Sequence, residues 1–187
     1  MKRILLIFAW LVCFAITAMA QAKYVFFFIG DGMGSNQVLA AEMYQAALKG
    51  EIGRVPLLMS QFPYSGQAAT FSASYGITDS AAAGTCLASG KKTNNGMIGQ
   101  TPDGELAISV ASQLKTEGWG VGIMSSVPVD HATPASHYAH AEKRYYYYKI
   151  GTQLTQSEFD FFGGGGFQGP TNKENAEDPN LYDLARE

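Results

Sequence analysis

The sequence predicts an α/β fold with a mainly parallel sheet and helices on both of its faces. Strand-type segments alternate with helical ones along the chain, as expected when parallel strands are joined by helices. The first strand-type segment, residues 24–29, is an unbroken aromatic and β-branched run, typical of a buried central strand. This run leads directly into Gly-Asp-Gly, so the strand is expected to end in a tight turn.

Further strands are expected at residues 65–71, 120–126 and 159–162. Helices are expected at residues 35–49, 80–89, 105–117 and 145–156, with another opened by Pro134. Ser35 can cap the first helix, and Gly50 and Gly90 can end the first two. The segment 97–105 is expected to be a hairpin or irregular loop, and the polar tail 168–187 a loop or linker.

Residues 1–20 have the pattern of a secretory signal peptide. Lys2 and Arg3 precede an apolar run over residues 4–16, and Ala18-Met19-Ala20 forms a cleavage site. The alternative is a membrane anchor, but a helix needs about 20 apolar residues to cross a bilayer. We therefore expect an exported protein, periplasmic or secreted, with no membrane span after signal cleavage. The short signal and the lack of disulfide cysteines favour a bacterial exported protein.

The composition excludes several classes of protein for residues 21–187, which are expected to belong to one domain. The net charge of the chain is −3, and removal of Lys2 and Arg3 makes it −5. No basic stripe is present, which argues against nucleic-acid binding as the main task. Cys13 leaves with the signal, so Cys86 has no partner for an internal disulfide.

Two loops at the ends of expected strands and helices contain candidate site residues. Asp31 follows the first strand, where its carboxylate could bind a metal ion, although an ordinary turn explains it equally well. Ser80 begins a helix of small residues, and the unpaired N–H groups of such a helix start favour a phosphate. The alternative is that Ser80 or Asp79 merely caps that helix. With no histidine nearby in sequence, a metal would have to activate the Ser80 hydroxyl.

A third loop follows the strand expected at 120–126. His131 and Thr133 could reach a metal ion or its waters. His137 and His140 have a spacing compatible with a zinc pair on one helix, but surface or hydrogen-bonded core histidines are preferred there. Arg144 could hold a phosphate with two hydrogen bonds, although by itself it is more often a surface charge.

Taken in order, these segments resemble the alkaline phosphatase family. The resemblance depends on Asp31-Gly-Met-Gly, then Asp79-Ser80-Ala-Ala, then His131-Ala-Thr133-Pro-Ala, then Arg144, with Phe-Gly-Gly-Gly from residue 162. It covers nearly all of the chain from residue 21 to about residue 166. It implies an alkaline-phosphatase-like fold, incomplete at its C-terminal end.

The resemblance also implies roles for individual residues. Ser80 corresponds to the nucleophile that becomes a phosphoserine, Arg144 holds the phosphate oxygens, and Asp79 positions that arginine. Asp31 bridges one of two Zn²⁺ ions and the Mg²⁺, and Thr133 is a ligand of the Mg²⁺ site. His131 takes a place that is Asp in some members, so this third site either prefers another metal or binds Mg²⁺ through water.

The implied activity is hydrolysis of phosphomonoesters to inorganic phosphate, and the implied assembly includes a homodimer. The Ser80 context favours this activity over that of related phosphodiesterases and sulfatases. Family members are more than twice as long, and their other metal ligands lie in the second half. The 187 residues are therefore expected to be part of a longer enzyme and inactive alone. The alternative is an exported, non-catalytic module that binds phosphate or a metal.

Overall fold

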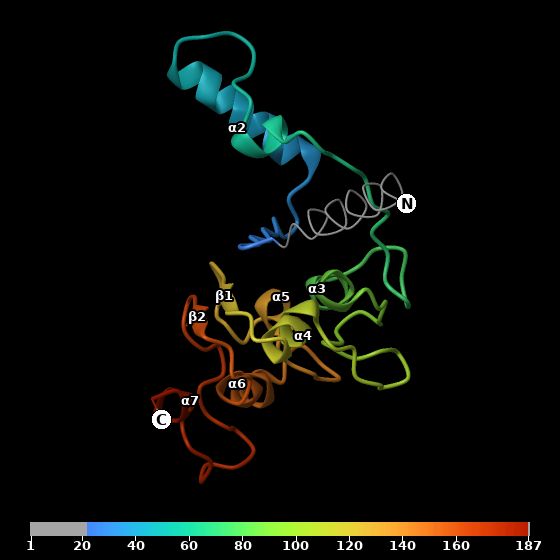
Figure 1. The fold of residues 1–187 in the computed structure, drawn as a ribbon, viewed down its shortest axis with the longest axis vertical. Helices are drawn as coiled ribbons and strands as arrows, with labels where there is room; N and C mark the ends of the chain where they lie inside the picture. The colour runs from blue at the N-terminus through green and yellow to red at the C-terminus, as the bar shows by residue number, and fades with distance from the viewer. Residues whose placement is uncertain (1–21, 187) are drawn as a thin grey trace, which may run out of the picture. The chain divides into compact units, whose positions relative to one another are not determined.

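The structure is a computed structural model that describes residues 22–186, so the expected signal peptide at residues 1–20 lies outside the described residues. The chain divides into two compact units, Met1–Val38 and Leu39–Glu187. The helices and strands are labelled in Figure 1. Among the described residues, no helix has both the length and the hydropathy needed to cross a membrane.

The strands predicted at residues 24–29 and 65–71 are not formed, and both predictions are wrong for this structure. Phe26 and Phe28 are exposed rather than buried. A strand needs a hydrogen-bonding neighbour to form, and the sheet within residues 22–186 contains only two strands, neither of them in these segments. The apolar pattern of these segments is typical of strands, but within residues 22–186 neither segment pairs with a neighbouring strand.

The first helix, α2 (Ser35–Leu48), agrees closely with its prediction. The chain reverses after α2 at Gly50, which has a φ of 72°. Glu42 is the buried carboxylate of this helix, and it accepts hydrogen bonds from Arg54 Nη1 and from the Leu57 N–H, both at 3.1 Å. These bonds hold the segment that leads into the short 3-10 helix η1 (Leu58–Gln61) against α2.

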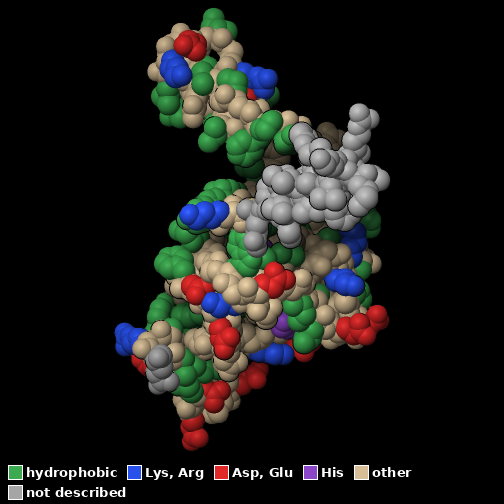
Figure 2. All heavy atoms as spheres, viewed as in Figure 1, with side chains coloured by type: hydrophobic (Ala, Val, Ile, Leu, Met, Phe, Trp, Pro, Cys, Tyr) green, Lys and Arg blue, Asp and Glu red, His purple; other side chains and the backbone are tan. Residues whose placement is uncertain are grey.

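The sheet consists of β1 (Gly122–Met124) and β2 (Phe161–Gly163), which pair in parallel with Ile123 opposite Phe162. Both strands lie within or next to their predicted segments, and their pairing confirms an α/β fold with a parallel sheet. The two helices between them are α5 (Ala132–Ala135) and α6 (Tyr147–Thr155). Met124 and Phe161 are exposed, and hydrophobic side chains occupy much of the surface visible in Figure 2.

Three further helices complete the second unit. The helix α3 (Ser80–Ser89) has its predicted bounds, and Gly90 ends it in the left-handed conformation with a φ of 72°. The helix α4 (Val110–Thr116) is shorter than predicted, because Ser109 caps it and Ala107 instead donates a hydrogen bond to Gly99 O. The helix α7 (Leu181–Leu184) forms in the tail, where a loop or linker was expected.

The core of the second unit lies between α3, α5 and α6. Its buried cluster consists of Ala81, Ile98, Val129, Ala132, Ala135, Tyr138, Ala139, Ala141, Ile150 and Leu154. Small residues let α3 and α5 pack closely: a Cβ at Gly84 would lie 2.6 Å from Ser136 Oγ. This close contact brings the loop before α5 next to the helix that begins with Ser80.

Candidate active site

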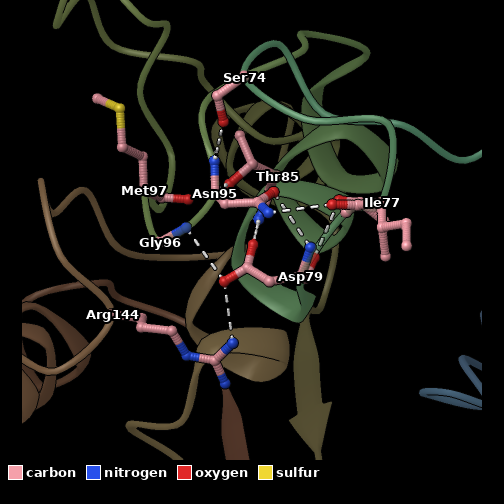
Figure 3. Close-up of polar contacts among 10 residues, drawn as sticks. Ser74, Ile77, Asp79, Thr85, Asn95, Gly96, Met97 and Arg144 are labelled. Atoms are coloured by element: carbon pink, nitrogen blue, oxygen red, sulfur yellow. Dashed lines mark hydrogen bonds and ion pairs between the residues drawn. The ribbon is translucent and has the colours of Figure 1, made fainter.

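The carboxylate of Asp79 connects three parts of the second unit. Asp79 is the residue that caps α3, and its Oδ1 accepts a hydrogen bond from the Ala82 N–H at 2.9 Å. Its Oδ2 accepts from the Gly96 N–H and from Arg144 Nη1, both at 3.1 Å (Figure 3). One side chain therefore caps the helix and binds the arginine.

The loop after α3 returns to the start of the same helix through Asn95. Its Oδ1 accepts a hydrogen bond from the Asp79 N–H at 3.2 Å, and its Nδ2 donates to Ile77 O at 3.1 Å. The Asn95 N–H donates to Ser74 Oγ at 3.0 Å, as Figure 3 also shows. The Asn-Asn-Gly sequence indicates a turn, but no sequence signal shows which segment the turn contacts. Asn95 is thus a site residue that the sequence did not indicate.

Arg144 is held by its backbone as well as by its side chain. Its N–H donates to Gly96 O at 2.7 Å, and its guanidinium carbon lies 6.0 Å from the centre of the Tyr145 ring. The Arg144 and Asp79 side chains are 16% and 25% exposed, so solvent screens this ion pair less than it screens a surface pair. A guanidinium has five N–H donors, so the bond to Asp79 leaves others for an anion.

Ser80 is the first residue of α3 and is half-buried. No hydrogen bond joins its hydroxyl to another residue in the range 22–186. The N-terminus of this ten-residue helix presents the positive end of its dipole, which favours a bound anion. Ser80 directly follows Asp79, whose carboxylate binds Arg144.

His131 and Thr133 lie at the start of α5. His131 precedes the helix as its cap residue, and its ring stacks on that of Tyr147 with centroids 6.4 Å apart. A Cβ at Gly84 would lie 3.7 Å from Thr133 Cα, so the backbone of Thr133 packs against the second turn of α3. The tertiary structure thus brings the His131–Thr133 segment close to the helix that carries Ser80.

The other two histidines do not form the helical zinc pair that their spacing allowed. His137 lies in a turn after α5, and His140 lies beyond that turn, outside any helix. His140 Nδ1 lies 2.5 Å from Gly99 O, and His137 Nδ1 lies 3.2 Å from Thr133 O. Burial lowers the pKa of His137 below its ordinary value. Both histidines are hydrogen-bonded within the unit, which is the alternative that the sequence favoured.

Asp130 is a buried residue that the sequence did not mark as functional. Its side chain has no solvent exposure, and its two oxygens accept hydrogen bonds from the N–H groups of Gln168 at 2.8 Å and Gly169 at 2.9 Å. Burial raises the pKa of Tyr138, and the nearby charge of Asp130 raises it further. The sequence signal was weak: a single carboxylate next to Val-Pro-Val, in an otherwise apolar segment.

The residues predicted to bind metals are divided between the two units. Asp31 belongs to Met1–Val38, while His131 and Thr133 belong to Leu39–Glu187. Within residues 22–186, no three His, Cys, Asp or Glu side chains gather closely enough to hold a metal ion. The imidazole, hydroxyl and carboxylate groups are suitable ligands for Zn²⁺ or Mg²⁺. Within the second unit, the imidazole of His131 and the hydroxyl of Thr133 therefore fit part of such a site.

A cavity of about 380 Å³ lies elsewhere in the second unit. Phenylalanines 159, 161, 162 and 167 line it, together with Leu154 and Ala185 among others. Asp79, Ser80 and Arg144 are not among the residues that line this cavity.

Comparison with known proteins identifies the family. The family model for alkaline phosphatase matches residues 22–181, and the chain therefore belongs to the alkaline phosphatase family. It is 36% identical to the tissue-nonspecific alkaline phosphatase of Gallus gallus over 137 residues, which are 67% of this chain and 26% of that protein. It is 32% identical to an alkaline phosphatase of Gadus morhua over 138 residues, covering 68% and 29% respectively. The chain spans about a quarter of the length of these curated relatives.

Solved structures support the same assignment. The structure resembles the alkaline phosphatase of the Antarctic bacterium TAB5, with a TM-score of 0.72, 28% identity, and 83% of this chain aligned to 43% of that one. It also resembles the Thermus thermophilus enzyme, with a TM-score of 0.73, 27% identity, and 85% of this chain aligned to 33% of that one. The fold is therefore a partial alkaline phosphatase fold.

Proposed function

We propose that this chain supplies the nucleophile and the phosphate-holding arginine of a phosphomonoesterase. The observation that supports this proposal best is the bond between Arg144 and Asp79, directly before Ser80 at the start of α3. Asp79 joins the Arg144 guanidinium to the N-terminus of the helix whose first residue is Ser80, which carries the hydroxyl group. Each of the three suits a phosphate group or its transfer.

In the proposed reaction, Ser80 Oγ forms a bond to phosphorus as the bond from phosphorus to the leaving alcohol breaks. Arg144 and the N-terminus of α3 balance the charge on the phosphoryl oxygens that do not react. Water then cleaves the phosphoserine, which releases inorganic phosphate and restores the Ser80 hydroxyl. Asp79 keeps the guanidinium in place during both steps.

Zn²⁺ and Mg²⁺ are the proposed cofactors. Asp31, His131 and Thr133 are their proposed ligands on this chain, together with the oxygen of the nucleophile Ser80. When bound, such ions make a hydroxyl or water more nucleophilic and stabilise a leaving oxygen. One solved relative is a variant of the TAB5 enzyme, with a histidine replaced by aspartate, that has Mg bound in its M3 site. We assign His131 to such a third site, where an imidazole favours a metal other than directly bound Mg²⁺.

The chain by itself is proposed to have little or no phosphatase activity. Each zinc site of a two-zinc enzyme requires three or four protein ligands, and the proposed ligands on this chain are too few to supply them. The proposed enzyme therefore needs ligands beyond residues 22–186. We also propose export to the periplasm or outside the cell, and assembly as a homodimer.

The test uses the complete enzyme and two measurements. The first is covalent labelling by radioactive inorganic phosphate at low pH, and the second is turnover of a phosphomonoester. Ser80→Ala should remove the label and nearly all of the turnover. Retention of the label in that variant would refute Ser80 as the nucleophile. In parallel, zinc-dependent turnover by the 187-residue chain would refute its proposed inactivity.

A second candidate is an exported module that binds phosphate or a metal without catalysis. The lack of a three-ligand metal group within residues 22–186 favours this alternative for the chain itself. The two candidates differ in the labelling experiment, because a binding module holds phosphate reversibly and forms no phosphoserine.

A further inference from the structure

The hydrogen-bonded pairing of β1 and β2 continues beyond the ends of both strands. The Ser125 N–H donates to Gly163 O, the Gly165 N–H to Val127 O and the Val129 N–H to Gly166 O, at 2.9, 3.0 and 2.9 Å. The two loops thus run side by side from the sheet to the segment that carries His131. Asp130 is the next residue, and there the side chain replaces the backbone as the acceptor.

The glycines of the second loop are required by this close approach. A Cβ at Gly164 would lie 2.8 Å from Val129 Cγ1 and 2.9 Å from Val127 O. A Cβ at Gly165 would lie 3.3 Å from Pro128 N. Because these positions have no side chain, the second loop can pass directly along the first one.

The carboxylate of Asp130 ends this pairing with two charged hydrogen bonds. Burial of a carboxylate is costly unless it is hydrogen-bonded, and here the Gln168 and Gly169 N–H groups bind one oxygen each. Hydrogen bonds to an ionised group are stronger than those between neutral groups. The position of Gly169 is therefore set by Asp130.

Gly169 in turn lies against the residue that stacks on His131. A Cβ at Gly169 would lie 2.6 Å from Tyr147 Cβ and 3.3 Å from Tyr148 N. The Tyr147 ring is inclined by only 16° to the His131 ring. A continuous series of contacts thus runs from Asp130 through Gly169 and Tyr147 to His131.

We propose that Asp130 is a positioning residue that holds the His131 imidazole in the orientation needed to bind a metal ion. Asp130 restrains His131 in two ways. It is the preceding residue in the chain, and it fixes the Gly169 backbone against Tyr147. The metal-binding consequence rests on the proposed function, whereas the orientation of His131 does not.

The test compares Asp130→Ala and Asp130→Asn with a matched control in the full 187-residue chain. Asp160 is the control, because its carboxylate also accepts a backbone N–H, that of Val121 at 2.7 Å, but at the opposite end of β1. In Asp130→Ala, the Gln168 and Gly169 amides should exchange with solvent at least about tenfold faster. In Asp160→Asn, any faster exchange should be confined to the Val121 amide and leave the Gln168 and Gly169 amides unchanged.

Two further measurements separate positioning from a purely structural role. Nuclear Overhauser contacts between the His131 and Tyr147 rings should disappear in Asp130→Ala and remain in Asp160→Asn. In a titration with Zn²⁺ alone, the concentration that half-saturates the His131 ring signals should rise at least about tenfold in Asp130→Ala. Asp130→Asn keeps one acceptor oxygen and the side-chain shape, so it should give intermediate values. It takes the place of Asp130→Ala in the test if the Ala variant does not fold.

Faster amide exchange with unchanged ring contacts would overturn the proposal, because Asp130 would then stabilise the loop without orienting His131. Unchanged ring contacts in both Asp130 variants would overturn it equally. If His131 of the wild-type chain does not respond to Zn²⁺, the metal role in the proposed function fails. The ring contacts then still decide whether Asp130 positions the histidine.

Discussion

Arg144 Nη1 lies 3.1 Å from Asp79 Oδ2, although 65 residues separate the two in sequence. The same carboxylate caps the helix that begins with Ser80. The orientation of the guanidinium is therefore tied to the start of α3 by a single side chain.

Asp79→Asn should weaken the binding of inorganic phosphate to the chain at least about fivefold. Asparagine is a good helix cap, so the bond to Ala82 remains, but the neutral amide no longer attracts Arg144. The free energy of unfolding should fall by about 1–2 kcal/mol, because the Gly96 N–H also loses its acceptor. Phosphate titration followed by NMR and chemical denaturation measure the two effects.

Ser109→Ala is the matched control for this variant. Ser109 Oγ caps α4 by accepting from the Ser112 N–H at 3.0 Å, so its loss should cost about 1 kcal/mol of stability. Phosphate binding should not change. If both variants weaken phosphate binding equally, the Asp79–Arg144 pair has no specific role.

Gly99→Ala should destabilise the fold far more than Gly104→Ala. Both glycines have a positive φ, 59° and 85°, which costs a residue with a side chain about 1–2 kcal/mol. A Cβ at Gly104 would meet open space, whereas one at Gly99 would clash with Ala139 O and lie 2.6 Å from His140 Nδ1. We expect a further loss of about 2 kcal/mol for Gly99→Ala, measured by denaturant unfolding. Equal losses would show that the His140 segment moves away freely.

Glu42 should make the stability of the α2 segment depend on pH. Hydrogen bonds from Ser60 and from the Leu57 N–H hold the pKa of Glu42 below its ordinary value of 4.5, with Arg54 adding to this. A carboxyl whose folded pKa is lowered contributes its full stability above the unfolded value. This contribution is lost as the pH falls below 4.5 through the folded pKa. Thermal unfolding by circular dichroism between about pH 7 and pH 3 measures it.

Glu42→Gln should lower the unfolding midpoint at neutral pH and reduce its fall between about pH 5 and pH 3. Glu51→Gln, on the exposed turn after α2, is the control and should behave like the wild type. An unchanged acid dependence in Glu42→Gln would contradict the assignment to Glu42.

Metal analysis of the 187-residue chain should find less than one tightly bound zinc ion per chain. An enzyme with a complete two-zinc site should hold about two zinc ions and one magnesium ion. The reason is that Asp31, His131 and Thr133 are too few to give any zinc site its three or four protein ligands. Atomic emission spectroscopy after equilibration and dialysis provides the measurement. One or more zinc ions per chain that survive dialysis would contradict this prediction.

Local signals were sufficient to predict some elements. The bounds of α3 follow from a run of small residues with Asp79 before it and Gly90 after it, and all three signals lie within one short segment. Helix caps and helical hydrogen bonds join residues a few positions apart, so they can be read directly from the sequence. The strands at 24–29 and 65–71 failed because a strand depends on a partner that local pattern does not supply.

Residue chemistry marked Ser80 and Arg144 as candidates, but their roles in the site were predictable only from the family resemblance. That resemblance singled out Asp79, Ser80 and Arg144, and the structure brings Arg144 to Asp79, which precedes Ser80. Asn95 and Asp130 follow no such motif. Their side chains accept hydrogen bonds from backbone N–H groups that are distant in sequence. The separation is 16 residues for Asn95, and 38 and 39 residues for Asp130. Tyr147 likewise becomes relevant only through its stacking on His131.

The sequence by itself determined the α/β class, the helix that carries Ser80 and the family to which these motifs belong. Helical periodicity, capping residues and glycine turns act over a few residues, so they leave a readable pattern. Only the tertiary structure decided that Asn95 binds the start of α3 and that Asp130 ties the glycine-rich loop to the segment of His131. These contacts arise when packing brings distant segments together, and the chemistry of each residue type permits many other partners.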